Sequence, residues 1–195
     1  YGIAFAQVCA QAERGAFFIS RDGNATLRRW EQRGYMPSGL AFSDARTAGT
    51  VEYDEIIVDS GAKYLANNAV LTTSGSTYTA DNSGSKTRYG TQSRRWETRL
   101  LDSPPATTAN YSIYAQDLAD QYAYPEPRCE SVSFSVAGLS SSDWATLLSM
   151  DLQWKTTVAR TLVYGVTLAF DCLVESISHD ISPNDWRVTF ELSPQ

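Results

Sequence analysis

Residues 169–192, AFDCLVESISHDISPNDWRVTFEL, decide the fold of this chain. Apolar and polar side chains alternate along Ala169–Asp180 and again along Trp186–Leu192, which is the period of a half-buried β-strand. Between these segments, Ser182–Asp185 reads Ser-Pro-Asn-Asp, a turn sequence. The residues therefore predict an antiparallel hairpin, and we expect Trp186 to help close a hydrophobic core.

Strict alternation along the first strand of this hairpin assigns its side chains to two faces. We expect Leu173, Glu175, Ile177 and His179 on one face, with Cys172, Val174, Ser176 and Ser178 on the other.

Further strands and two helices are predicted upstream of the hairpin. The clearest helix covers Thr108–Tyr122, where apolar and tyrosine side chains share one face and Pro125 follows. A shorter helix is predicted over Ser142–Met150. The strand patterns are Val51–Asp59, Tyr64–Thr73, a short strand at Tyr78 within the exposed turn Thr72–Ser85, Gln92–Leu100, Cys129–Val136, Trp154–Arg160 and Leu162–Thr167.

The N-terminal segment has a different pattern. Apolar side chains at helical spacing over residues 3–14 end at Gly15, a residue typical of helix C-termini. Ala16–Arg21 and Ala25–Trp30 then predict a hairpin around the Asp22-Gly23 turn. Gln32–Gly49 shows no sustained period, and we interpret it as a connector.

These patterns predict two parts and a fold class. Residues 1–48 are expected to form a helix plus β-hairpin element and connector, part of a larger upstream domain. Residues 49–195 are expected to form a β-barrel-like domain with inserted helices. The fold class is α+β, mainly β: a small β-barrel or sandwich with one long and one short helix, preceded by the helix–hairpin element. Because Tyr1 is not an initiator methionine, we expect a fragment of a longer protein.

Composition excludes several classes of protein. The 195 residues are 43% hydrophobic and include 5 Trp, 11 Tyr and 7 Phe, too much apolar surface for a disordered chain. A net charge of −6 argues against nucleic-acid binding through a basic surface patch. No apolar run approaches the roughly 20 residues of a membrane span.

Cysteine and histidine usage argues against a structural zinc site. The chain has 3 Cys, without a CxxC pair, and 1 His. We expect Cys9, Cys129 and Cys172 to be three separate buried thiols, with one disulfide plus a free thiol as the alternative.

His179 is the only histidine, so any acid–base or triad mechanism would pass through it. Ser176 and Ser178 share its strand and Asp180 is adjacent, but no GxSxG nucleophile elbow accompanies them. We interpret His179 as structural. The sequence predicts no catalytic residue, no cofactor-binding residue, no cofactor and no metal ligand.

The residues also offer candidates for a carbohydrate site and for a calcium site. Glycosidases need two carboxylates across a sugar, and aromatic side chains can stack on sugar rings. We interpret the candidate carboxylates as side chains on solvated strand faces, and the tryptophans as residues that pack in the core or at an interface. The carboxylates are Glu52, Asp54, Glu55, Asp171 and Glu175, and the tryptophans are Trp30, Trp96, Trp144, Trp154 and Trp186. Asp22-Gly23-Asn24 and Asp81-Asn82 lack the ligand spacing of a calcium loop and predict turns.

A series of short motifs runs in order along the chain. Leu173–Trp186 followed by Thr189–Pro194 matches a VEGISHxIxPxxWxTxFxLSP pattern, with Ser176 replacing Gly. The other matching segments are Ala12–Gly23 (AExGxxFxxxDG), Tyr53–Ile57, Ser85–Gly90 (ending in YG), Tyr122–Arg128 (YxxPxxR) and Met150–Leu152. Gly61–Thr87 departs from the pattern. The series resembles the minor tail proteins of long-tailed actinobacterial phages.

The resemblance implies a structural, non-enzymatic part of a tail hub or baseplate, a virion component at the tail tip. Such proteins are built from small β-barrels with attached α/β elements. Three chains would form a homotrimeric ring that continues the tail tube and contacts distal tail, fibre and tape-measure proteins. An acidic lumen would let DNA slide past without sequence-specific contact. The alternatives are a carbohydrate-binding or glycan-cleaving domain at the tail tip and a non-phage β-barrel interaction domain.

Overall fold

The computed structural model describes residues 5–7, 9–10, 15–29, 32, 35–45, 47, 49–73, 75–97 and 108–195. The chain divides into two compact units. We call residues 18–59 with 128–195 the barrel unit, and residues 1–17 with 60–127 the inserted unit.

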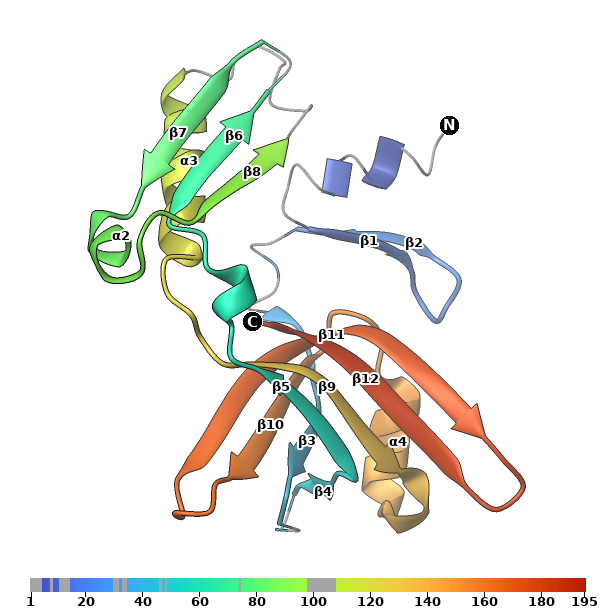
Figure 1. Ribbon diagram of the computed structural model, residues 1–195. Coiled ribbons are helices and arrows are strands. Elements are labelled where there is room, and N and C mark those ends of the chain that lie inside the picture. Colours follow the sequence, from blue (N-terminus) through green and yellow to red (C-terminus); the bar gives the residue numbers. More distant parts are fainter. Residues whose placement is uncertain are drawn as a thin grey trace. The chain divides into compact units, whose positions relative to one another are not determined.

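The barrel unit contains a seven-stranded sheet (Figure 1). Strand β3 runs parallel to β4 and to β10, and all the other pairs are antiparallel. The strands are, in spatial order, β4 (Val51–Glu52), β3 (Ser38–Ser43), β10 (Lys155–Thr161), β11 (Thr167–Ile181), β12 (Trp186–Pro194), β9 (Arg128–Ser135) and β5 (Glu55–Asp59).

The two edge strands of this sheet are joined by only two residues. β4 ends at Glu52 and β5 begins at Glu55, so Tyr53 and Asp54 cross from one edge to the other. A flat sheet would hold these edges about 29 Å apart, at ~4.8 Å per strand, whereas three residue steps reach only about 11 Å. The sheet must therefore curl, and it forms a half-barrel. The Asp54 N–H continues the pairing by donating to the Ser133 carbonyl of β9 at 2.8 Å.

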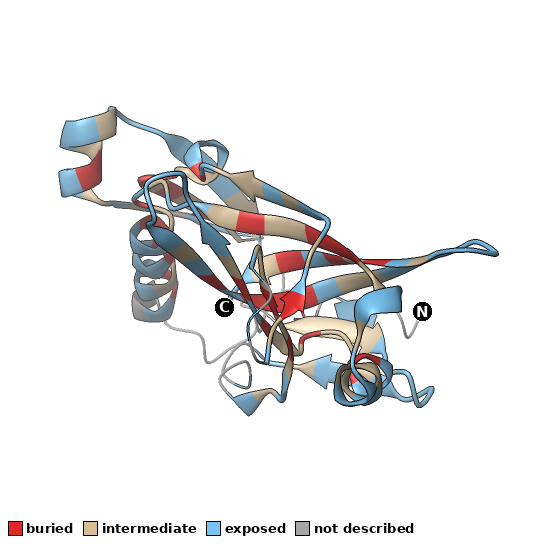
Figure 2. Ribbon diagram, turned by 90° about the horizontal axis from the view of Figure 1, so that it is seen from below, coloured by how far each residue is buried: buried red, intermediate tan, exposed pale blue. Residues whose placement is uncertain are grey.

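Three phenylalanine rings fill the concave interior of the half-barrel. Phe42 lies 4.9 Å from Phe134 and 5.8 Å from Phe190, and the last two are 5.5 Å apart, all between ring centroids. Helix α4 (Ser141–Ser149), capped at Ser140 by a capping box, adds Leu147 to the same core. Figure 2 shows the buried residues along the sheet strands and the exposed residues at the hairpin ends.

A β-bulge in β11 changes which of its side chains share a face. Val174 pairs with Leu192 and Ser176 pairs with Glu191, so Glu175 is one extra residue. Beyond it, Ile177 lies opposite the buried Phe190 and packs against the core to which Val174 belongs. Strict alternation is thus wrong beyond Val174, because the bulge shifts the side-chain phase by one residue.

The same bulge is fixed by side chains from two other segments. Gln153 donates from Nε2 to a carboxylate oxygen of Glu175 at 2.6 Å, and the Ser193 hydroxyl donates to the other oxygen. Gln153 itself has a φ of 65°, a left-handed conformation that is uncommon outside glycine. These contacts hold the extra residue in place.

Two of the three cysteines meet in the core instead of lying apart. Cys129 and Cys172 are buried free thiols, and Cys9 is half-buried. A hydrogen bond with Cys129, and then burial, raise the pKa of the Cys172 thiol, which therefore stays protonated. The expectation of three free thiols is confirmed over the alternative of one disulfide, but Cys129 and Cys172 are in contact and Cys9 is only half-buried.

The segment Gln32–Gly49 is not only a connector, because it contains β3. This strand pairs with β10, more than 100 residues away, and buries Leu40 and Phe42. A Cβ at Gly39 would lie 2.7 Å from the Met150 sulfur, so the absence of a side chain there permits close packing. The division of the chain at residue 48 stays a prediction, although β3 belongs to the seven-stranded sheet.

Several other expected elements are confirmed with changes. The N-terminal hairpin forms as β1 (Ala16–Ile19) and β2 (Ala25–Arg28). Residues 5–7 and 9–10 are helical, and the rest of the helix expected over 3–14 lies outside the described residues. The strand expected over Val51–Asp59 is two strands, and Leu162–Thr167 is a turn with only its last residue in β11.

The chain leaves the barrel unit after β5 and returns at β9, where Asp59 pairs with Arg128. The inserted unit has a three-stranded sheet in the order β7-β6-β8, with β6–β7 antiparallel and β6–β8 parallel. Its elements are η2 (Ala62–Tyr64), β6 (Asn68–Thr72), β7 (Thr77–Asp81), α2 (Ser83–Tyr89), β8 (Ser93–Glu97) and α3 (Thr108–Gln121). The sequence analysis did not predict α2 or η2: α2 begins within the segment interpreted as an exposed turn, and η2 ends at the first residue of the strand expected over Tyr64–Thr73.

Helix α3 is the long helix that the sequence predicts. Its buried Tyr111, Ala115 and Leu118 pack against β6, which supplies Ala69 and Leu71. Among the described residues, no helix has the length and hydropathy required to cross a bilayer.

Gly61 lies at a position where the structure leaves no room for a side chain. Its φ is 78°, and a Cβ there would overlap the backbone of Glu126, whose nitrogen is at 2.7 Å. Gly61→Ala should therefore destabilise the chain by about 3 kcal/mol, more than the ~1–2 kcal/mol of left-handed backbone alone. Gly165→Ala is the matched control, with the same φ of 78° and nothing within 4 Å. Urea unfolding measures both variants, and equal losses would contradict the predicted clash.

Candidate functional site

His179 lies in an aromatic stack rather than beside a nucleophile. It is exposed on β11, and its Nδ1 accepts a hydrogen bond from Trp186 Nε1 at 3.2 Å. The Trp186 ring in turn lies 5.2 Å from the Trp144 ring of α4, in an edge-to-face arrangement. We call His179, Trp186 and Trp144 the aromatic stack. It attaches α4 to the β11–β12 hairpin.

The serines and the aspartate near His179 do not form a triad with it. His179 pairs with Val188, whereas Ser178 pairs with Thr189 and Asp180 with Arg187. Directly paired residues share a face and successive residues alternate, so Ser178 and Asp180 point away from the imidazole. Ser176, on the same side of the bulge as Ser178, is also on the opposite face from His179.

Three of the five candidate carboxylates, Asp54, Asp171 and Glu175, are engaged in separate structural contacts. Asp54 forms an ion pair with Arg187 at 3.5 Å, and Asp171 accepts from the Thr157 hydroxyl at 3.3 Å. Glu175 is held at the bulge, and Glu55 is exposed. The structure brings Glu52 and Asp54 together only along a shallow hollow of about 160 Å³ that Asp143 also lines.

Nothing in the described ranges gathers metal-ligating side chains into a group of three or more. The Asp22-Gly23 turn is confirmed, with the Gly23 N–H donating to the Ser20 carbonyl at 2.8 Å. Asn82, expected in a turn, is instead the N-cap of α2, where it accepts from the Ser85 N–H at 3.0 Å.

The tryptophans do not form an open platform for sugars. Trp96 stacks on Tyr122 in the inserted unit, with ring centroids 5.9 Å apart, and Trp154 packs against the barrel core. Trp144 and Trp186 are half-buried against each other, and Trp30 lies outside the described residues. The four described tryptophan rings are thus used in packing.

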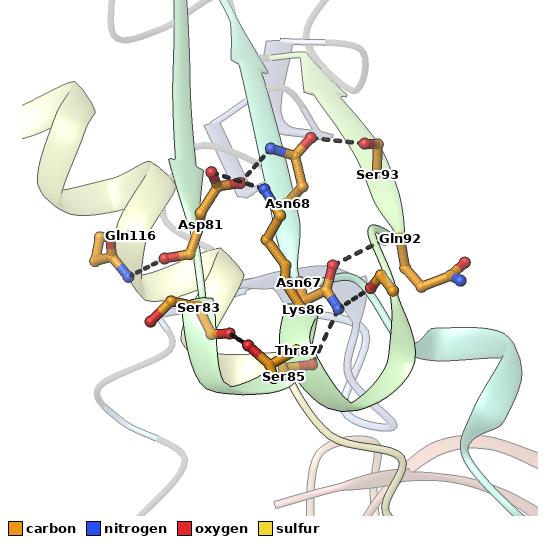
Figure 3. A network of polar contacts seen from close by, with 11 residues as sticks. Asn67, Asn68, Asp81, Ser83, Ser85, Lys86, Thr87, Gln92, Ser93 and Gln116 are labelled. Atoms are coloured by element: carbon orange, nitrogen blue, oxygen red, sulfur yellow. Dashed lines mark hydrogen bonds and ion pairs between the residues drawn. The ribbon is translucent and has the colours of Figure 1, made fainter.

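A cluster of polar side chains in the inserted unit surrounds the fully buried Asn67 (Figure 3). The Asn67 amide donates to Ser85 Oγ at 3.1 Å and to the Gly90 carbonyl at 2.8 Å, and its oxygen accepts from the Gln92 N–H at 2.8 Å. The Ser85 hydroxyl donates to the Ala123 carbonyl. These bonds connect the start of β6, helix α2, the start of β8 and the end of α3.

The outer part of this cluster is charged. Asn68 donates to Asp81, and Lys86 lies 2.9 Å from the same carboxylate. The hydrogen bond from Asn68, followed by that from Lys86, lowers the pKa of Asp81. The sequence analysis did not predict this cluster. The only local pattern that indicates part of it is the three-residue spacing of Asn82 and Ser85, which is typical of a helix N-cap.

These arrangements stabilise the fold. Asn67, Asp81 and Glu175 are held by neighbouring segments, and His179 is held by Trp186. In these contacts the side chains position helices and strands relative to their neighbours.

Replacing Trp186 tests the aromatic stack. Trp186→Ala should cost about 2 kcal/mol, below the ~3–5 kcal/mol of a fully buried tryptophan, because the indole is only half-buried. His179→Ala is the control and should cost less than about 1 kcal/mol, the value of one exposed hydrogen bond. The measurement is chemical denaturation followed by tryptophan fluorescence. A neutral Trp186→Ala variant would show that the indole does not hold α4.

Replacing Asn67 tests the polar cluster. Asn67→Ala should cost about 3 kcal/mol, because it leaves the buried Ser85 hydroxyl without its donor and two part-buried hydrogen bonds, with the Gly90 carbonyl and the Gln92 N–H, unmade. Asn68→Ala, at the exposed edge of the cluster, should cost about 1 kcal/mol or less. Thermal unfolding monitored by circular dichroism compares the two, and equal effects would contradict a special role for the buried amide.

The fold has counterparts among solved structures, although no family model and no curated protein matches the chain. The 43 kDa tail protein of prophage MuSo2 from Shewanella oneidensis superposes over 99% of this chain with a TM-score of 0.56 and 10% identity. The tail protein of Neisseria meningitidis MC58 superposes over 96% with a TM-score of 0.54 and 10% identity. The chain spans about half of each, 52% of their lengths. At this identity the likeness is one of fold, and the chain has the fold of phage tail proteins.

Proposed function

We propose that this chain is a structural component of a phage tail, within the hub or baseplate at the tail tip, as a minor tail protein. The observation that carries the proposal is the fold, which matches tail proteins over nearly the whole chain, including both the curled sheet and the inserted unit. A chance likeness of a small barrel alone would not extend through the insert.

The proposed assembly is a homotrimeric ring with distal tail, fibre and tape-measure proteins as neighbours. Open sheet edges support such contacts. In the described part of the inserted unit, β7 and β8 border the three-stranded sheet with no further strand paired outside them. An unpaired strand edge offers backbone donors and acceptors to another chain. The net charge of −6 suits a lumen that DNA must pass without binding.

The proposed role is non-enzymatic. The imidazole of His179 is directed away from the nearby serine hydroxyls, and Asp54, Asp171 and Glu175 have separate structural partners. The alternative of a glycan-binding or glycan-cleaving domain needs exposed aromatic faces beside paired carboxylates. The packing of Trp144 on Trp186 does not favour it.

The composition of purified phage particles tests this proposal. Quantitative mass spectrometry should find the chain in tailed particles, at a small multiple of three copies and far below the number of tail-tube subunits. A known three-copy or six-copy tail protein in the same sample calibrates the count. Absence from the particles would overturn the proposal, and a copy number equal to that of the tube subunit would overturn the hub assignment.

A further inference from the structure

Two buried thiols meet in the core of the barrel unit. Cys129 lies in β9 and Cys172 in β11, and each is 2% exposed. The Cys172 thiol donates a hydrogen bond to the Cys129 sulfur, and the Cys129 thiol donates to the Ser131 carbonyl at 3.6 Å. The two sulfur atoms are thus neighbours, although no bond joins them.

This contact depends on the curl of the sheet. Strands β9 and β11 are second neighbours, with β12 between them (Figure 1). In a flat sheet second neighbours lie about 9.6 Å apart, whereas residues of β9 and β11 come within 8 Å of each other, Cα to Cα. A disulfide needs Cα atoms about 4.4–6.8 Å apart. Joining the two sulfur atoms therefore needs at most a small further tightening of the curl, and the bond would then hold that curvature.

The pair lies where the strand pairing ends. Ser131 is the last β9 residue paired with β12, so Cys129 has its strand partner on the β5 side, at Val58. Cys172 lies opposite Pro194, the last residue of β12, which has no N–H to donate. Strand ends open before the rest of a sheet. A small oxidant can therefore reach the thiols by local opening, without global unfolding.

The two thiols differ in reactivity. The hydrogen bond from Cys172 lowers the pKa of the Cys129 thiol, whereas the hydrogen bond with Cys129, followed by burial, raises the pKa of Cys172. The thiolate is the reactive form of cysteine, so Cys129 reacts first and Cys172 supplies the second thiol. A reacting cysteine beside a resolving cysteine is the arrangement of a redox-sensitive site.

We propose that Cys129 and Cys172 form an oxidation site, at which hydrogen peroxide converts the two thiols into a disulfide that locks the curl of the barrel unit. The Cys129 thiolate attacks the O–O bond, which breaks, and forms a sulfenic acid while hydroxide leaves. The Cys172 sulfur then bonds to the Cys129 sulfur, and the sulfenic hydroxyl leaves with the Cys172 proton as water. In total the two thiols lose two protons and two electrons, and one peroxide becomes two waters.

The time at which the lock forms rests on the proposed function, whereas the reactivity of the pair does not. A tail protein is assembled in the reducing cytoplasm and is then released into an oxidising medium, where disulfides persist in virions. The thiols are therefore reduced while the chain folds and assembles, and the disulfide forms in the released particle. The bond then joins β9, to which the chain returns from the inserted unit, to β11.

Oxidation of the purified full chain tests the site. The protein is treated with hydrogen peroxide, the remaining thiols are blocked with iodoacetamide, and tryptic peptides are analysed without reduction. We expect the peptide Cys129–Lys155 to be linked to Thr161–Arg187, which contains Cys172. The oxidised chain should melt about 10 °C above the reduced chain, because a disulfide that closes a long loop restricts the unfolded state.

Two variants provide the controls. Cys9→Ala removes the half-buried thiol and leaves the pair intact, so it should form the same linked peptides and gain the same melting temperature. Cys172→Ala should form no linked peptides, and Cys129 should stop at the sulfenic acid, which dimedone labels. After peroxide treatment of the unmodified chain, free thiols at both positions, a bond from either one to Cys9, or an unchanged melting temperature would overturn the inference.

Purified phage particles test the setting. Thiols are blocked as the particles are opened, and the same linked peptides are expected there but not in infected cells blocked before lysis. Particles that contain the chain with both thiols free would overturn oxidation in released phage and leave the proposed function standing. Absence of the chain from particles would overturn the proposed function and, with it, this setting.

Discussion

The link of two residues between the edges of the sheet is the constraint on which the barrel unit depends. Tyr53 and Asp54 connect two edge strands that would lie about 29 Å apart in a flat seven-stranded sheet. Once the edges are pinned, the strands can only curl, and the concave face must be filled. Phe42, Phe134 and Phe190 come from strands β3, β9 and β12 and meet there because of that curvature. The thiols of Cys129 and Cys172 come together in the same space.

The sequence predicted the elements whose evidence is local. The hairpin 169–192 and helix α3 have long, regular patterns, and both form at nearly the expected residues. The prediction of strands and faces was wrong where the contact that determines the structure is distant in sequence. Strand β3 is six residues long and takes its place from β10, and the phase of β11 is reset at Glu175 by Gln153 and Ser193. No local pattern contains those partners.

The candidate site could likewise be predicted only in part. That His179 has a structural role was an interpretation of what the sequence lacks, and its contact with Trp186 follows from the β11–β12 register. The cluster around Asn67 was not predicted, because its partners come from four segments of the inserted unit. An apolar run at 162–166 was interpreted as a strand and is instead an exposed turn.

The central claim is that this fold serves as an assembly module of a phage tail, and a cryo-electron microscopy map of the assembled tail tests it most directly. At a resolution that separates strands, the account predicts density for the curled seven-stranded sheet in three copies around the tube axis, with the two-residue link at the sheet edges recognisable in each copy. Density for this chain in a peripheral fibre, or a ring whose subunits have an open, uncurled sheet, would contradict it.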